Sequence, residues 1–482
     1  MKKKLLGAFL MVLVSVQSII AQTNTVKNWI EIGTGITDGK YQPFWLRSNQ
    51  YGMVPVKGSY FQTNAGYVQD YKKNGRLKFG YAANIQFLVG TDKSAIQIPE
   101  LYVKSKFGIF ELWAGMRKQT LGIVDSTISS GSFAWSGNSL PIPKLELSVP
   151  NWFYLKKGGL FAFKGNFAHG VLENNRDDVA HAFLHQKSFY GQFGREHSTV
   201  KLFAGFNHQV QWGGKLLYPD PNNIIGINGQ IPTTARDYFY VVTGFTLGSK
   251  GDTTLNGKND AWNRAGNHLG TIDLGAEIDF GSFKVLGYRQ SYYEDGSLFY
   301  LSNITDGLHG ISIQSKKNTL FKKLVLEYFN STSQGGGLGS GEGNGALRGL
   351  DNYFNNGAYT NGWTYRRMGV GSPFITLDSD TDLKPGNATY FDNNRVEAFY
   401  IASEWEINQT KILFKGSLAN AIGWYGEEYV PVKKMYSIAF FIQKPTKILG
   451  YDALLKCNVG YDKSEWYHNT LGLNLGVSMP LF

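Results

Sequence analysis

Hydrophobic and polar side chains alternate with a period of two through residues 76–89, which read RLKFGYAANIQFLV. Alternation of this kind predicts a β-strand. Strands of soluble sheets usually have about five or six residues, so this longer strand suits a tilted membrane crossing whose apolar face meets lipid. The apolar face carries Leu77, Phe79, Tyr81, Ala83, Ile85, Phe87 and Val89, and the opposite face carries Arg76, Lys78, Asn84 and Gln86.

The same alternation recurs along most of the chain. In residues 271–280 the apolar Ile272 and Leu274 alternate with Asp273 and Glu277, and such acids suit a water-filled lumen better than lipid. We count about sixteen to eighteen segments, a number typical of large outer-membrane barrels. The sequence therefore predicts an all-β fold, one large antiparallel transmembrane β-barrel. Other segments are residues 59–71, 96–106, 110–117, 159–169, 200–212, 238–247, 284–293, 324–330, 396–408, 412–424, 436–442, 451–461 and 470–482.

Some stretches break the alternation. Residues 118–157 are rich in Ser, Gly and Pro and are expected to form a long loop, and the Gly-rich residues 331–349 a mobile one. Outer-membrane barrels commonly carry long loops on one rim. Residues 177–186 predict a small helix, with Asp177 or Asp178 as its N-cap.

The N-terminus has the features of a secretory signal peptide. Three lysines at residues 2–4 precede an apolar run over residues 5–14, and Ala21 supplies the small residue of a cleavage site. We therefore expect residues 1–21 to be removed and residues 22–482 to form a single barrel domain in the outer membrane of a Gram-negative bacterium. No later apolar run approaches the roughly 18 residues of a membrane-spanning helix, so a closed barrel is the remaining way to span.

Composition narrows the possible partners. Aromatic residues make up 15% of the chain, and Gly (58) far outnumbers Pro (14), which suits aromatic girdles and strand bends but also a soluble secreted β-sandwich adhesin. Cys457 is the single cysteine, so no intrachain disulfide can form. The net charge of +11 is spread over strands and loops instead of forming a run, which argues against nucleic acid. For an exported barrel, the available anions are polysaccharide uronates and lipid phosphates.

Catalytic and metal motifs are incomplete. His181 and His185 have the spacing of a zinc pair on the predicted helix, but the glutamate of H-E-x-x-H is missing. Residues 378–382 carry Asp at alternate positions like the start of a calcium loop, but Leu383 stands where Gly is needed. The chain lacks the G-x-S-x-G of a serine hydrolase. We expect no enzyme activity, no metal and no cofactor, which disfavours an outer-membrane hydrolase.

The chain carries several short motifs in this order: PFWL (residues 43–46), ELY (100–102), residues 129–143, QWGG (211–214), GNHLG (266–270), DGL (306–308) and NNR (393–395). In their number and order, these motifs resemble the capsule assembly Wzi family. The resemblance implies an outer-membrane barrel of about 18 strands, with a small helical element at one end, that anchors capsular polysaccharide at the cell surface as a lectin would. It implies no catalytic residues.

Polysaccharide binding calls for side chains that grip uronates and sugar faces. Arginine can bind a carboxylate in bidentate fashion, and aromatic rings offer flat apolar faces to sugar rings. Arg289 and Tyr293 are expected to face the lumen if Tyr288 and Tyr292 face lipid. The candidate polysaccharide-binding residues are Arg289, Tyr293, Asn267, His268, Trp212 and His208.

The remaining candidates lie near strand ends. His208 and Trp212 fall in the apolar phase of their strand, and Asn267 and His268 precede the strand at residues 271–280, at a rim. The resulting hypothesis is a monomeric barrel among outer-membrane lipids that binds capsular polysaccharide. A passive porin explains the same strand pattern and is the alternative.

Overall fold

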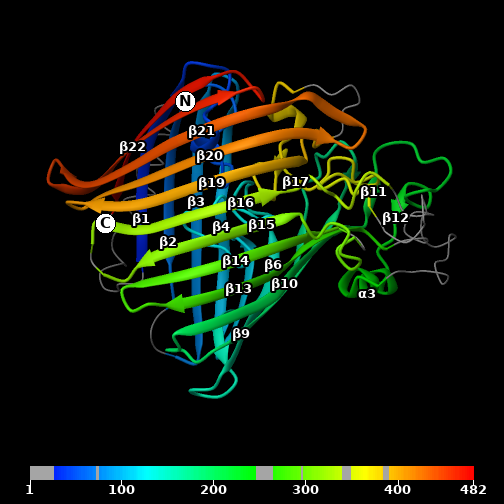
Figure 1. Ribbon diagram of the computed structural model, residues 1–482, viewed down its shortest axis with the longest axis horizontal. Helices are drawn as coiled ribbons and strands as arrows, with labels where there is room; N and C mark the ends of the chain where they lie inside the picture. Colours follow the sequence, from blue (N-terminus) through cyan, green and yellow to red (C-terminus); the bar gives the residue numbers. More distant parts are fainter. Residues whose placement is uncertain are drawn as a thin grey trace, which may run out of the picture.

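Eighteen strands form one closed antiparallel sheet in the computed structural model (Figure 1). The structure describes residues 26–71, 75–245, 264–294, 297–317, 319–338, 349–383 and 390–481. Each strand pairs with the next barrel strand along the chain, and the sheet closes where the first strand pairs with the last, with Ile32 opposite Val477. The predicted transmembrane barrel fold is confirmed.

The barrel strands, in order around the sheet, are β1 (Val26–Thr37), β2 (Tyr60–Gln69), β3 (Leu77–Gly90), β4 (Ser94–Phe107), β5 (Phe110–Met116), β6 (Lys144–Tyr154), β7 (Phe161–Val171), β9 (Phe183–Phe193), β10 (Val200–Trp212), β13 (Asn267–Asp279), β14 (Phe283–Tyr293), β15 (Gly307–Ser315), β16 (Phe321–Asn330), β19 (Arg395–Ile407), β20 (Thr410–Trp424), β21 (Glu427–Ile448), β22 (Tyr451–Ser464) and β23 (Thr470–Pro480). Two small sheets lie outside it, formed by β8 (Val179–Ala180), β11 (Gly214–Leu216) and β12 (Gln230–Ile231), and by β17 (Thr364–Tyr365) and β18 (Met368–Gly369).

The two rims of the barrel differ in the length of their connections. At one rim, which also holds the start of β1 and the end of β23, the connections are tight turns such as residues 108–109 and 408–409. At the other, residues 117–143, 213–266 and 331–394 are long connections. We call these the short-turn rim and the long-loop rim; the latter lies at the right in Figure 1, where β11, β12 and β17 gather. The prediction of long loops on one rim is confirmed.

The alternation in β3 separates lipid from lumen as predicted. Phe79 and Val89 are exposed on the outside, and Asn84 and Gln86 are buried on the inside. The same two-faced pattern continues around the barrel, with Ile272 and Leu274 outside and Asp273 buried inside on β13. A period of two places alternate side chains on opposite faces of the sheet, so each strand contributes to both the lipid-facing and the lumen-facing surface.

The hydrophobic core lies inside the barrel, where long-loop segments fold inward. Trp45, in the short helix α2 (Phe44–Arg47), packs against Tyr400 of β19 with ring centroids 4.7 Å apart. Phe133, in residues 117–143, stacks on Tyr292 of β14 at 4.5 Å and meets Phe329 of β16 at 4.7 Å. These inward segments occupy part of the middle of the lumen and narrow it. A 3-10 helix, η2 (Asp378–Asp380), lies in the long connection over residues 331–394, where Asp378 and Ser379 line a cavity.

Helix and strand are exchanged relative to two predictions. The helix predicted at residues 177–186 is wrong, because this stretch contains β8 and the start of β9, where Phe183 faces out and Leu184 faces in. The strand predicted at residues 238–247 is also wrong, because α3 (Ala235–Thr243) forms there. A capping box, in which Thr234 and Asp237 bond each other's backbone N–H, starts α3, and Gly244 in the left-handed region ends it.

Other predictions differ in extent or stay untested. The loop expected at residues 118–157 stops at Lys144, because the alternation of Lys144 to Ser148 begins β6. Residues 1–21 and most of the Gly-rich stretch, residues 339–348, lie outside the described residues. Within the described ranges, the helices are all too short or too polar to cross a bilayer.

Candidate functional site in the barrel lumen

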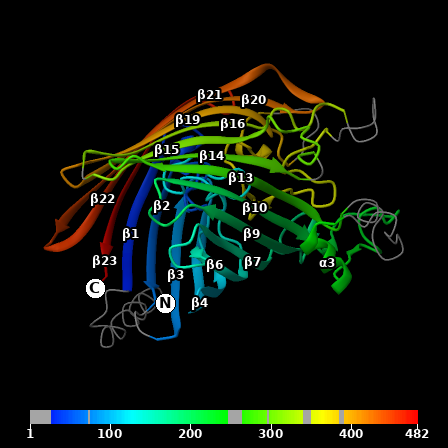
Figure 2. The same cartoon turned by 60° about the horizontal axis from the view of Figure 1, so that its bottom comes forward.

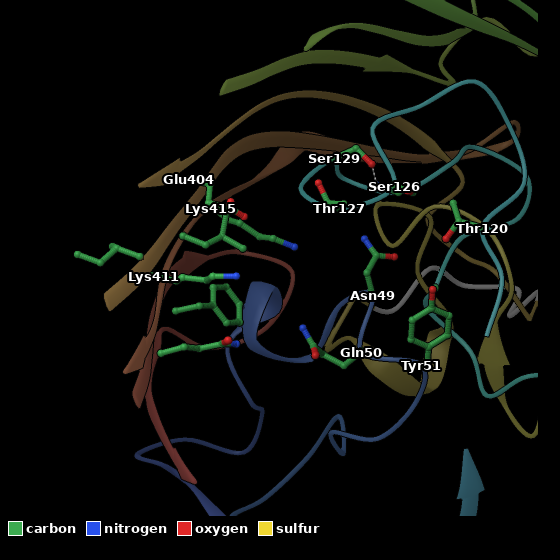
Figure 3. Close-up of a pocket in the computed structure, with 16 residues that line it drawn as sticks. Asn49, Gln50, Tyr51, Thr120, Ser126, Thr127, Ser129, Glu404, Lys411 and Lys415 are labelled. Atoms are coloured by element: carbon green, nitrogen blue, oxygen red, sulfur yellow. Dashed lines mark hydrogen bonds between the residues drawn. The ribbon is translucent and has the colours of Figure 1, made fainter. Parts of the chain in front are cut away.

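A cavity of about 350 Å³ lies in the lumen beside β20 (Figure 3). One wall comes from β20 and β21, and the opposite wall from two inward segments, residues 38–59 and 117–143. We call it the lysine cavity, because two lysines of β20 point into it. It is lined by Asn49, Gln50, Tyr51, Thr120, Ser126, Thr127, Ser129, Gly131, Gly137, Glu404, Lys411, Ile412, Leu413, Lys415, Phe441 and Gln443.

Lys411 and Lys415 stand on the lumen face of β20, four positions apart. Lys411 lies near the short-turn rim and is exposed, whereas Lys415 lies deeper and its residue is only 5% exposed. The Lys415 Nζ lies 5.4 Å from the centre of the Trp45 ring and 5.7 Å from that of Phe441. No carboxylate oxygen of the described residues lies within the 4.0 Å of an ion pair with Lys415.

A second lumen cavity of about 450 Å³ adjoins the first and shares Gln50, Phe441 and Gln443 with it. Its lysines have acidic neighbours. Lys456 Nζ lies 2.6 Å from Glu31, and Lys118 Nζ lies 3.8 Å from Glu100. Burial lowers the pKa of Lys118, which follows β5. The second cavity is therefore polar with largely compensated charge, in contrast to Lys415.

Buried acids fix the inward segment that borders the lysine cavity. Glu327 of β16 accepts hydrogen bonds from the Ser130 N–H at 2.7 Å and the Tyr288 hydroxyl at 2.6 Å. Asp273 of β13 accepts from the Ile123 N–H at 2.8 Å. Because buried polar groups are costly to leave unpaired, these bonds define where residues 117–143 lie in the lumen.

A larger cavity of about 830 Å³ opens at the long-loop rim, and its lining is rich in acids and amides. Arg367 lines it and pairs with Asp177 at 3.1 Å. The aromatic core around Phe133 and Trp45 lies between the inward segments, so the lumen is narrowed between its two ends. Other residues lining this cavity include Glu294, Asp351, Asn352, Asn355, Asn356, Asp378 and Tyr390.

The prediction that Arg289 and Tyr293 face the lumen is wrong. Tyr288 and Tyr292 occupy the inner face of β14, where Tyr288 bonds Glu327 and Tyr292 stacks on Phe133. Arg289 and Tyr293 are therefore on the outer face. The Arg289 guanidinium donates to the Ser291 hydroxyl at 3.1 Å and to the Ile304 carbonyl.

The helix α3 folds back over the outer face of the barrel wall, beside the ends of β9 and β10 in Figure 2. His208 and Trp212 are in the outward phase, as expected from the sequence, but α3 covers them. Tyr238 of α3 lies 5.7 Å from Trp212 and bonds His169 Nε2 at 2.7 Å. Lys187, also outward, donates to the Val242 carbonyl.

The six predicted polysaccharide-binding residues do not form one site. His208 Nε2 and His268 Nδ1 are 2.9 Å apart under α3. Asn267 instead points inward and donates to Gln211 at 2.9 Å, and Arg289 lies on the outer wall. Asn267 and its neighbour His268 thus lie on opposite faces of the barrel wall.

The metal motifs also separate. His181 is exposed in a turn with a positive φ of 55°, and His185 is buried on β9, so no helix aligns them. Asp382 pairs with Lys40 at 2.7 Å and accepts from the Tyr41 hydroxyl at 2.8 Å. Among the residues that the structure describes, no group of three His, Cys, Asp or Glu side chains has the geometry to hold a metal ion.

Comparisons with known proteins return similar folds only. No family model and no curated protein matches the sequence. Among solved structures, Pseudomonas aeruginosa OccK5 (OpdH) is 8% identical, with 95% of this chain and 98% of that chain covered and a TM-score of 0.48. A BenF-like porin from Pseudomonas fluorescens is 8% identical, with 95% and 99% covered and a TM-score of 0.47. P. aeruginosa OccK2 (OpdF) is 10% identical, with 94% and 97% covered and a TM-score of 0.46.

These findings correct two expectations. The resemblance to the capsule assembly Wzi family is wrong: no family model matches the sequence, and the solved structures of similar fold are OccK proteins and a BenF-like porin. The expectation that the protein anchors capsular polysaccharide rested on that resemblance and is wrong as well.

The sequence reasoning did not single out the lysines of the cavity. Lys411 and Lys415 share one phase of an alternating segment, which is the signal that could have found them. The depth of Lys415 and its lack of an acid within ion-pair distance among the described residues depend on the inward segments, whose path no local pattern reveals.

Proposed function

We propose that the protein is an outer-membrane porin that lets small polar solutes diffuse through its lumen. The observation that carries this proposal is the pair of adjoining polar cavities inside a closed barrel whose outer face is apolar. A lumen lined by polar side chains serves water and solutes, whereas an apolar exterior serves lipid. The inner segments narrow the passage, so we expect a small conductance.

The charge in the lysine cavity supports a preference for anions. Lys411 and Lys415 face Glu404 as the one acid of the lining, so positive charge is in excess. Charged side chains that line a pore favour ions of the opposite sign. In a salt gradient across the membrane, the sign of the reversal potential should therefore be that of an anion-selective pore.

The test is conductance of the purified barrel in planar bilayers. We expect discrete small steps with an anion preference, and replacing both Lys411 and Lys415 by Met should shift the reversal potential toward cations. Replacing Lys93, an exposed lysine in the turn between β3 and β4, is the matched control and should leave it unchanged. A folded barrel that inserts but passes no ions contradicts the porin proposal.

The location and processing of the chain are part of the proposal. We infer that the barrel resides in the outer membrane as a monomer, contacts its lipids through the exposed apolar face, and loses residues 1–21 on export. Membrane fractionation and N-terminal sequencing of the mature protein test this, and a mature chain that starts at Met1 contradicts the cleavage.

A further inference from the structure

We propose that the lysine cavity binds a small organic carboxylate, with Lys415 as the residue that holds the anion and Lys411 as a cation at the entrance. The proposal deepens the porin function, on which it rests, because it names the class of solute. The binding itself can be measured without any conductance, so the two can fail separately.

Lys415 is a buried cation without an ion-pair partner among the described residues, and Glu327 is the one acid whose charge acts on it from further away. Its residue is 5% exposed, and its ammonium has two aromatic rings as neighbours and no acid within ion-pair distance among the described residues. Burying an ammonium is costly unless a partner compensates, and cation–π contacts compensate only in part. An anion in the cavity would supply the missing partner.

Other buried lysines of the lumen show the usual solution. Lys104 lies 2.6 Å from Asp70, and Lys144 lies 3.7 Å from Glu146 and donates to Gln186 at 2.6 Å. Both therefore have their partners within the protein. Lys415 differs from them in facing a cavity instead of a carboxylate.

The opposite wall supplies polar groups for the rest of the ligand. Figure 3 shows Lys411 and Lys415 pointing from β20 toward Asn49 and Gln50 of the inward segment. The hydroxyl-bearing Ser126 also lines the cavity. A carboxylate has two oxygens and accepts several hydrogen bonds, so one oxygen can meet Lys415 while the other meets the amides.

The size and lining favour an organic monoanion over inorganic phosphate. The cavity of about 350 Å³ is at the lower end of small-molecule sites. Leu413 and Phe441 give it apolar wall, which suits the body of an organic acid. Glu404 adds a negative charge to the lining, which disfavours a multiply charged phosphate.

The experiment is calorimetric titration of the detergent-purified full chain with butyrate, with butyramide as its uncharged counterpart and with inorganic phosphate. We expect saturable butyrate binding that exceeds binding of the other two. K415M should weaken it about 10- to 100-fold, the usual loss for a hydrogen bond to a charged group. K415R keeps the charge and should stay within about 3-fold, and the exposed K411M should lose less than K415M. K93M is the control outside the cavity.

Heat-dependent gel mobility and circular dichroism check that each variant is a folded barrel. If K415M does not fold, K415Q removes the same charge with a polar side chain and is compared with K411M in its place. Butyrate binding that is unchanged in folded K415M, or no stronger than butyramide binding, overturns the proposal. Tighter phosphate than butyrate binding overturns the carboxylate class. A barrel that binds butyrate through Lys415 but passes no ions contradicts the porin function, whereas the proposed carboxylate site stands.

Discussion

Phe133 offers a direct test of how the inward segments narrow the lumen. Its side chain has no exposed surface and sits in an aromatic cluster with Tyr292, Phe329 and Tyr353. Phe133→Ala removes the ring but leaves the backbone bonds of the segment, such as the Phe133 N–H to Gln290 at 2.8 Å. The variant should therefore loosen residues 117–143 without detaching them.

The expected cost follows from the burial. Truncating a buried Phe to Ala usually costs about 3–5 kcal/mol, and each aromatic pair contributes about 0.5–1.5 kcal/mol beyond its buried area. Phe133 makes two close pairs, at 4.5 and 4.7 Å, and a third at 6.4 Å, which places it in the upper part of that range. This energy is lost from the packing of the inner segment, because the barrel strands keep their pairing.

Single-channel conductance and limited proteolysis measure the outcome. F133A should conduct more than the parent and should expose residues 117–143 to protease, while heat-dependent gel mobility still reports a closed barrel. Phe161→Ala is the control, because Phe161 is 58% exposed on the lipid face of β7. Equal conductance and equal protease resistance in F133A and the parent would refute the idea that this segment restricts the lumen.

Three further outcomes are expected. Burial, and then the charge of Asp378, raise the pKa of Asp392 to about 8, well above the roughly 3.9 of an unfolded Asp. The folded state therefore favours the protonated acid. The contribution of Asp392 to the free energy of unfolding is complete below pH 4 and is lost as the pH rises toward 8. Asp392→Asn should flatten this fall in thermal scans at pH 4 to 8, and a variant with the parent's slope would disprove it. Thr234→Ala removes the capping box of α3 and should cost about 1 kcal/mol locally, seen as faster hydrogen exchange in α3 alone; unchanged exchange would contradict it. Leu274→Arg puts a charge on the lipid face, where Leu274 is 55% exposed, and should cost about 2–4 kcal/mol in urea titrations of vesicle-inserted barrel, against no cost for Leu274→Phe.

The barrel could be predicted because its pattern is local. In β3 each side chain meets either lipid or lumen, so residues 76–89 display the two faces in their own sequence. The same holds for β13, where Asp273 marks the lumen side. Strand pairing in sequence order then follows from short turns at one rim, which an alternating pattern with turns between its segments already implies.

The phase of β14 could not be read from its own residues. Tyr288 and Tyr292 suit a lipid girdle as well as a packed interior, because a tyrosine has an apolar ring and a polar tip. The phase of β14 is decided by residues 117–143, which fold into the lumen. Phe133 of this segment stacks on Tyr292, and Tyr288 donates to Glu327, which also accepts from Ser130. The lysine cavity was out of reach for the same reason, because its far wall comes from distant parts of the chain.

Helix and strand were exchanged at residues 177–186 and 238–247 for a related cause. The stretch around His181 and His185 has mixed helical and alternating spacing, and pairing of β9 with β7 and β10 selects the strand. In α3, the aromatic residues favour a strand by propensity, but the capping box and the packing of Tyr238 against Trp212 select the helix.

The position of α3 outside the wall has a consequence for the order of assembly. The wall beneath it presents His208, His268 and Lys187 toward the outside, a polar stretch that lipid tails would solvate poorly. The helix can cover this stretch only after the chain between β10 and β13 has emerged at the long-loop rim. Insertion of the barrel and docking of α3 are therefore coupled, and a barrel halted before α3 docks would expose a polar patch to the surrounding lipid.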